Sequence, residues 1–219
     1  GETLGDWVRV LAENGQYLAR HGKPNANIDD LWRFEVLQAN GLGPVPVLDA
    51  VTDASMVTPG VALSLSRSFP NSISGRHVEG PFGWGWTLNW NLTLTEDTNG
   101  LVQIGGCCGG PQRRYEPDIR TPGSFFSMPG DTSSLRKLRH STFELSEPNG
   151  TVTRFAAGGQ LDAVEDPNGN RVTASYDGSG RLEALTHTSG AGLLIGYNAA
   201  GRIETISDTA GRTNVFTYD

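Results

Sequence analysis

Residues 159–179 read GQLDAVEDPNGNRVTASYDGS, residues 180–200 read GRLEALTHTSGAGLLIGYNAA, and residues 201–219 read GRIETISDTAGRTNVFTYD. Two glycine positions and one tyrosine position recur at an interval of 21 residues. They are Gly159, Gly180 and Gly201; Gly169, Gly190 and Gly211; and Tyr176, Tyr197 and Tyr218. A unit of this length cannot bury a core alone, so the pattern predicts stacked units that share one core.

Each unit contains two short runs of β-branched and aromatic residues around a glycine-containing turn. Such runs are typical of a two-stranded hairpin. The predicted strands cover 202–207 and 214–218, 181–186 and 193–197, 161–164 and 171–176, and, in a degenerate copy, 143–145 and 151–155. The sequence therefore predicts an all-β fold: an extended antiparallel sheet of stacked hairpins, solenoid-like or shell-like, with little or no helix.

The repeats resemble a known family. The Gly-Arg-Leu or Gly-Arg-Ile opening and the final Tyr176-Asp177 and Tyr218-Asp219 are similar to the tyrosine-aspartate (YD) repeats of RHS proteins, relatives of teneurin shells and of toxin-complex cocoons. Upstream, VALSLSRSF (61–69) and GPFGWGW (80–86) are similar to the segment that precedes those repeats. Two departures are Asn198 in place of aspartate and a turn at His187 without an acidic residue.

The resemblance implies a part of a hollow β-shell that encloses a C-terminal toxin or presents an adhesive surface, secreted or at the cell surface. In the family, a separate core region after many repeats closes the shell and carries the aspartates for self-cleavage. No stretch of residues 1–219 resembles that region, so we expect a structural protein without catalytic residues.

The chain divides into three predicted parts: an N-terminal cap or arm (1–43), a pre-repeat β region (44–136) with an irregular loop at 105–131, and the repeats (137–219). Two prolines in Pro44-Val45-Pro46 mark the first boundary, because proline holds the backbone extended and removes a ladder donor. Within the β region, alternation of apolar and polar residues predicts strands at 61–69 and 86–95.

Strands are also predicted in the N-terminal part. Residues 6–11 and 16–19 flank Glu13-Asn14-Gly15, a hairpin signal. Residues 31–37 alternate strictly, and Asn40-Gly41 follows as a turn would, so we expect a strand here rather than a helix that starts at Asp29 or Asp30.

Charge and hydropathy exclude several partners. The formal net charge is −7, so a nucleic-acid backbone is not an expected partner. No apolar run approaches the roughly 20 residues that a membrane-spanning helix needs. The chain starts at Gly1 without a charged and apolar leader, so we expect a processed or excised chain.

Cys107 and Cys108 are adjacent and lie between pairs of glycines. Three states are compatible with this arrangement: a disulfide between the two neighbours, intermolecular bridges, or two reduced thiols. A metal site is not expected, because no further cysteine or closely spaced histidine pair completes a ligand set. No cofactor is predicted.

Several residues have both a functional and a structural interpretation. Trp84 is a candidate for stacking on a sugar ring, whereas Trp86 and Trp90 alternate as core residues. Asn91 and Asn149 begin glycosylation sequons. The sequence Asp166-Pro167-Asn168-Gly169 favours a β-turn over a calcium loop. Arg113-Arg114 and residues 136–139 are interpreted as solvated charge.

The predicted partners follow from the repeats. A terminal hairpin presents unpaired backbone groups along a sheet edge. Either further YD repeats cover this edge, or identical subunits stack through sheet edges into a filament. The alternative function is a carbohydrate-binding or adhesive module that uses Trp84.

Overall fold

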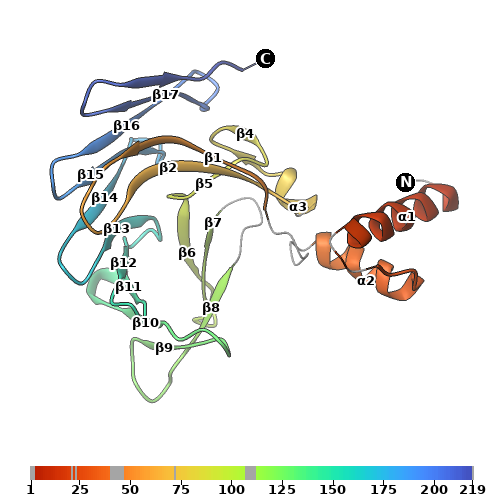
Figure 1. The fold of residues 1–219 in the computed structure, drawn as a ribbon. Helices are drawn as coiled ribbons and strands as arrows, with labels where there is room; N and C mark the ends of the chain where they lie inside the picture. Colours follow the sequence, from red (N-terminus) through yellow and green to blue (C-terminus); the bar gives the residue numbers. More distant parts are fainter. Residues whose placement is uncertain are drawn as a thin grey trace.

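An antiparallel sheet of 13 strands forms the main body of the chain (Figure 1). The computed structural model describes residues 3–20, 22, 24–39, 47–71, 73–106 and 112–218, apart from the side chains of residues 37–39, 73 and 74. The elements before the 13-stranded sheet are α1 (Leu4–Arg20), α2 (Ile28–Ala39), β1 (Val47–Met56), β2 (Leu63–Pro70), α3 (Ile73–Arg76), β3 (Glu79–Gly80), β4 (Gly83–Trp84) and β5 (Thr87–Leu88). The predicted all-β class is confirmed.

The strands of the large sheet follow one another in chain order from β6 to β18. They are β6 (Leu92–Glu96), β7 (Val102–Gly106), β8 (Arg113–Pro117), β9 (Ser124–Ser127), β10 (Ser134–Lys137), β11 (Phe143–Ser146), β12 (Val152–Phe155), β13 (Leu161–Glu165), β14 (Arg171–Tyr176), β15 (Leu182–His187), β16 (Gly192–Tyr197), β17 (Ile203–Asp208) and β18 (Thr213–Val215), with a 3-10 turn at Arg139–Ser141. Each strand pairs with its neighbours in the chain, so the predicted repeat hairpins lie side by side in one sheet.

The sheet curls until its first strand meets its own middle (Figure 1). The backbone N–H of Leu94 in β6 donates to the carbonyl of Gly159, in the turn between β12 and β13, at 2.7 Å. Thr93 and Gln160 form a bridge beside it. A Cβ on Gly159 would stand 2.0 Å from the carbonyl oxygen of Leu94, and its φ is +81°. Only glycine permits the β6 backbone to come this close to the turn.

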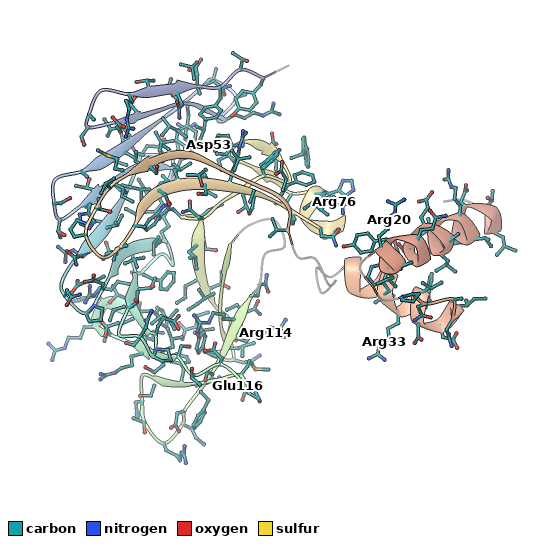
Figure 2. The ribbon with its side chains drawn as sticks, in the orientation of Figure 1. Arg20, Arg33, Asp53, Arg76, Arg114 and Glu116 are labelled. Atoms are coloured by element: carbon teal, nitrogen blue, oxygen red, sulfur yellow. The ribbon has the colours of Figure 1, made fainter. Side chains whose placement is uncertain are left out.

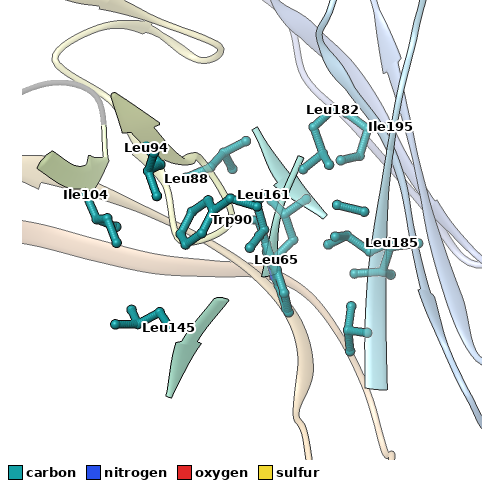
Figure 3. Packing of buried hydrophobic residues seen from close by; sticks show 14 of the residues in the cluster. Leu65, Leu88, Trp90, Leu94, Ile104, Leu145, Leu161, Leu182, Leu185 and Ile195 are labelled. Atoms are coloured by element: carbon teal, nitrogen blue, oxygen red, sulfur yellow. The ribbon is translucent and has the colours of Figure 1, made fainter. Parts of the chain in front are cut away.

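The core lies between the curled sheet and the β1–β2 hairpin, which crosses in front of it (Figures 1 and 3). Leu63 and Leu65 of β2 are fully buried, as the alternation at 61–69 predicts, and they share one core cluster with Trp90, Leu161 and Leu185. Burial of apolar surface of this kind contributes about 25 cal/mol per Å². The hairpin and the repeats are therefore held together by a common core.

Two predictions about the pre-repeat region are wrong. The predicted strand 86–95 is divided: β5 pairs with β2, whereas β6 opens the large sheet. At the division, the Asn89 side chain accepts from the N–H of Ser66 and donates to the Ser64 carbonyl, which replaces strand pairing and lets the chain change sheets. The predicted irregular loop 105–131 contains β8 and β9, whose runs of four or five residues are too short for alternation to distinguish from loop.

The strands predicted in the N-terminal part are also wrong, because residues 6–11, 16–19 and 31–37 lie in α1 and α2. Thr3 and Asp6 form a capping box, with Asp6 N–H to Thr3 Oγ1 and Thr3 N–H to Asp6 Oδ2, both at 3.2 Å. Asn27 caps α2 by accepting from the N–H groups of Asp29 and Asp30. The strict alternation at 31–37 is thus overridden by capping and by burial of Leu31 and Phe34 at helical spacing.

Candidate functional site at the open end of the sheet

The recurring tyrosines join the end of each unit to the first strand of the same unit. The hydroxyls of Tyr176, Tyr197 and Tyr218 donate to the carbonyls of Leu161, Leu182 and Ile203, at 2.8, 2.8 and 2.6 Å. Burial raises the pKa of Tyr176 and of Tyr197 to about 12. The same bond therefore recurs in each unit, and it requires a protonated phenol.

Arginine side chains connect the beginning of a unit to its end. The Arg181 guanidinium lies 4.5 Å from the ring centroid of Tyr197, and Arg202 lies 5.5 Å from that of Tyr218. Such cation–π contacts add about 0.5–1 kcal/mol at exposed sites. The arginine after the glycine of one unit thus stacks on the tyrosine that ends that unit.

The turns between units are held by one side-chain oxygen each. Asp177 Oδ1 accepts the backbone N–H groups of Ser179 and Arg181, and Asn198 Oδ1 accepts those of Ala200 and Arg202. Gly180 and Gly201 follow with φ of +78° and +77°. Asparagine therefore replaces aspartate at this turn without loss of a backbone bond.

The arginine of the Asn198 turn, however, forms its ion pair with a residue outside the turn. Arg181 pairs with Asp177 in its own turn at 2.7 Å, whereas Arg202 pairs with Glu79 of β3 at 3.2 Å. The N–H of Ile203 also donates to the carbonyl of Pro81, at 2.8 Å. The diverged turn is thus the point where the pre-repeat segment docks on the last unit.

The turn within each unit follows the same rule. Asp166 and Asp208 each accept two backbone N–H groups, so the Asp166 stretch is a β-turn, as predicted. At the equivalent position, His187 is 2% exposed and its Nδ1 accepts the N–H of Ser189 at 2.9 Å. Histidine thus supplies the same acceptor from a buried position.

A partly buried ion pair holds the β1–β2 hairpin against the last unit. Arg67 of β2 lies 3.3 Å from Asp53 of β1, and the two side chains are 26% and 6% exposed. The guanidinium sits 5.1, 4.9 and 5.6 Å from the ring centroids of Phe82, Trp86 and Phe216. We refer to these five residues as the clamp. It brings together the hairpin, the pre-repeat segment and the residue that follows β18.

A β-bulge in β1 orients the Asp53 side chain toward Arg67. The β1–β2 register shifts between Thr52 and Ala54, so Asp53 is the extra residue. Burial raises the pKa of Asp53, and the charge of Arg67 opposes this effect. The Asp53 Oδ2 and Arg67 Nε atoms make no hydrogen bond among the described residues, so their attraction is ionic. Figure 2 labels Asp53 where the hairpin passes in front of the last strands.

The strand β18 is the open edge of the sheet. Asp208 N–H donates to the Arg212 carbonyl and Phe216 N–H donates to the Glu204 carbonyl. Because inward and outward groups alternate along a strand, the N–H and C=O groups of Thr213 and Val215 face away from β17. Val215 is 67% exposed. The described chain thus presents two outward donors and two outward acceptors at this edge.

The side chain between them, that of Asn214, is exposed but hydrogen-bonded to β1. Asn214 donates to the carbonyl of Asp53, and Arg212 donates to that of Ser55 at 3.1 Å. The β1 strand therefore buttresses the inner side of β18 without pairing with its outer edge. The strand β18 is therefore already fixed in position before another strand pairs with its outer edge.

A second charged cluster lies at the start of β8. Arg113 pairs with Asp131 and Glu147, and the Tyr115 hydroxyl bonds Ser133 at 2.8 Å. Hydrogen bonds to Asp131 and Glu147 raise the pKa of Arg113, and the bond from Arg113 lowers the pKa of Asp131. The interpretation of Arg113 as solvated charge is therefore wrong, because its guanidinium is ion-paired with both carboxylates. The sequence pattern does not indicate these pairs, because the carboxylates lie 18 and 34 residues later in the chain.

The other predicted site residues are dispersed. Trp84 is 58% exposed on β4, Asn149 is exposed in the β11–β12 turn, and Asn91 is half-buried between β5 and β6. Cys107 and Cys108 lie outside the described residues, as does Pro44-Val45-Pro46. Within the described ranges, the side chains of His, Asp and Glu form no group of three that would hold a metal ion.

Neither α1 nor α2, nor any other helix in the part of the chain that the structure describes, combines the length and apolar character of a membrane-crossing helix.

The clamp has one signal in the sequence: Arg67 is the polar break in the apolar row of 61–69. Asp53 and Phe216 carried no signal, because a bulge and a long-range contact place them. Charged residues that interrupt an apolar alternation are therefore worth testing as ion-pair partners.

Comparison with known proteins covers the segment that contains β1 to β7. No curated protein matches the chain. Residues 46–106, which include Asp53, Arg67, Phe82 and Trp86 of the clamp, match the family described as Domain of unknown function (DUF6531).

Proposed function

We propose that this chain is a structural segment of an RHS-type β-shell, secreted or at the cell surface, and that its sheet is extended by strand addition at β18. The observation that supports this proposal is that the N–H and C=O groups of Thr213 and Val215 point away from β17, on a strand that the clamp supports. Unpaired edges of this kind are templates for another strand. The chain contributes a wall and has no reaction of its own.

The YD-repeat character of the units supports this proposal. Three tyrosines make the same bond 15 residues back along the chain, and four turns between or within units use an aspartate or asparagine acceptor. The DUF6531 match covers 61–69 and 80–86, on which the resemblance also rests. Because the units share these bonds, a further unit of the same kind could pair with the last strand in the same way.

Two kinds of strand fit the open edge. A further repeat of the same chain would continue the order from β18, and a second copy would supply a free edge of its own. The β1 strand is the outer strand of the three-stranded sheet, but its Asp53 and Ser55 carbonyls already accept from the last unit, so only the part of β1 before Asp53 suits the second role. The strand β6 suits it less, because Leu94 already donates to Gly159.

The decisive test adds one unit. A copy of residues 180–200 is joined after Asp219, and amide hydrogen exchange is measured by NMR. We expect the exchange of Thr213 and Val215 amides to slow by about tenfold or more, because each gains a strand partner. Unchanged exchange at both amides would contradict strand addition.

A substitution at the edge tests association between copies. Val215→Pro removes an outward N–H but leaves the bonds to β17, as edge strands tolerate. We expect it to lower light scattering by concentrated protein, whereas Val215→Thr, which keeps the N–H, does not. Filaments of equal length from both variants would exclude β18 as the contact.

A carbohydrate-binding module is the second candidate, favoured by the exposed indole of Trp84 on a short hairpin. Tryptophan presents a flat apolar face to a sugar ring. Under this proposal, glycan-array binding is lost in Trp84→Ala and retained in Phe126→Ala, which removes another exposed aromatic side chain. Equal binding by both variants would remove this candidate.

A further inference from the structure

The helical hairpin carries an exposed apolar patch. Trp7 of α1 and Trp32 of α2 meet at its centre, with ring centroids 4.9 Å apart, and remain 40% and 47% exposed. The patch consists of the exposed residues Leu4, Trp7 and Val8 of α1 and Ile28, Trp32 and Val36 of α2. Their spacings of three and four residues place them on one face of each helix.

These residues are not the core of the hairpin. Leu18, Leu31 and Phe34 form that core, with Leu11 and Tyr17 packed against it. The patch is therefore a second apolar face, and a contiguous exposed face with two tryptophans is typical of a protein contact.

The border of the patch carries both signs of charge. Asp29 and Arg33 are exposed and lie four residues apart, in the stripe next to Ile28, Trp32 and Val36. In Figure 2, Arg33 points away from α1 into solvent. A border with one acidic and one basic residue on the same stripe complements itself when the helix is reversed. It does not favour an anionic membrane, which selects basic borders.

We propose that this patch binds the same patch of a second copy, related by a two-fold axis near Trp32. The two α2 helices run antiparallel, so Ile28 faces Val36 of the second copy and Trp32 faces Trp32. The same alignment places Asp29 near Arg33 of the second copy, twice by symmetry. This contact uses no residue of β18 and does not depend on the proposed function.

The first test is the mass of the particle. Sedimentation velocity over a range of concentrations detects a dimer for the wild type and for Val215→Pro, in which the β18 edge is blocked. Trp32→Glu raises the dissociation constant by about tenfold or more, because it places a carboxylate at the centre of the contact. The matched control Trp84→Glu makes the same change outside the patch and leaves the constant unchanged.

Charge reversal tests the antiparallel alignment. Asp29→Arg places two arginines together at each end of the contact, and Arg33→Asp places two aspartates together, so each variant alone is monomeric. An equimolar mixture restores both opposite-charge pairs and forms a heterodimer. Circular dichroism of each variant verifies that the helices are retained.

Three results would overturn the proposal: a monomeric Val215→Pro chain at every concentration, a dimer that Trp32→Glu leaves intact, or a mixture of the two charge variants that stays monomeric. Loss of association in Val215→Pro with retention in Trp32→Glu would instead assign all association to the open edge.

Discussion

The two ends of the 13-stranded sheet are closed to different degrees. At β6, the N–H of Leu94 is bound to the Gly159 turn of the same sheet. At β18, no such turn of the described residues lies beside the outward groups of Thr213 and Val215, and the clamp holds the inner side of the strand. Under the proposed function, a sheet with one edge closed on itself and the other supported from within is extended at β18 alone.

The largest expected effect breaks the closed end. Gly159→Ala places a Cβ 2.0 Å from the Leu94 carbonyl oxygen, in a backbone with φ of +81°. Strain in this conformation and the clash together cost about 3 kcal/mol, so we expect a clear loss in the free energy of unfolding. Urea unfolding measures it.

Gly169→Ala is the matched control. Its φ is +82° and a Cβ there meets nothing within 4 Å, so only the conformational cost of about 1–2 kcal/mol remains. Equal losses in the two variants would show that the contact between β6 and the Gly159 turn contributes nothing to stability.

The next effect concerns the clamp at the open end. Arg67→Met leaves the buried Asp53 carboxylate without its counter-charge and removes three aromatic contacts. We expect a loss of about 2–3 kcal/mol, below the range for fully buried pairs because Arg67 keeps part of its side chain in solvent. The double variant Asp53→Asn/Arg67→Met should lose less than Arg67→Met, which a double-mutant cycle of unfolding free energies determines.

The same variant should change the pH dependence. Burial raises the pKa of Asp53 above its ordinary value, and loss of Arg67 removes the opposing effect. A raised carboxyl pKa means that the folded state holds its proton more tightly, so stability is present at low pH and is lost as pH rises through that pKa. The deficit of Arg67→Met relative to wild type should therefore shrink toward acid pH; a constant deficit would contradict the assignment.

The repeats were predictable because local and long-range signals agree there. Gly169, Gly190 and Gly211 mark turns with positive φ, and each strand pairs with the next strand in the chain. Local alternation therefore predicts the pairing partner as well as the strand. Tyr197 recurs for a reason that the pattern alone did not reveal, namely its bond to the Leu182 carbonyl.

The N-terminal part was mispredicted because two patterns coincide. The residues Trp32, Phe34 and Val36 alternate as in a strand, but Phe34 pairs with Leu31 on the buried helix face while Trp32 and Val36 form the exposed one. The capping residues Thr3 and Asn27 were the signals that distinguish the two. The clamp was missed for another reason: the contact between Arg67 and Phe216 joins residues distant in sequence, which periodicity does not report.

A smaller effect compares an interior tyrosine with the terminal one. Tyr197→Phe removes the bond to Leu182 at a cost of about 1 kcal/mol, and Tyr218→Phe at the open end should cost less, because Tyr218 is less enclosed by neighbours. Thermal unfolding of the two variants measures the difference. A larger loss for Tyr218→Phe would show that the open end is as rigid as the interior.

Alkaline titration sharpens the comparison. The pKa of Tyr197 is raised from 10.0 to about 12, so the stability it contributes is present below 10.0 and is lost as pH rises toward 12. Tyr197→Phe should flatten this part of the alkaline stability profile. An unchanged profile would show that Tyr197 is not among the groups responsible.

The smallest expected effect separates the two turns that precede Gly180 and Gly201. Backbone and side-chain bonds from Arg181 lower the pKa of Asp177, so its contribution is present above its ordinary value of 3.8 and is lost as pH falls through the lower folded value. Asp177→Asn keeps the two backbone bonds, as Asn198 does, but gives up the ion pair with Arg181. It should be slightly less stable than wild type at neutral pH and equal to it in strong acid, in thermal unfolding followed across that range. Asn198→Asp is the reciprocal change, and it should add an acid-sensitive contribution only by drawing Arg202 from Glu79, which loosens the pre-repeat segment at the open end.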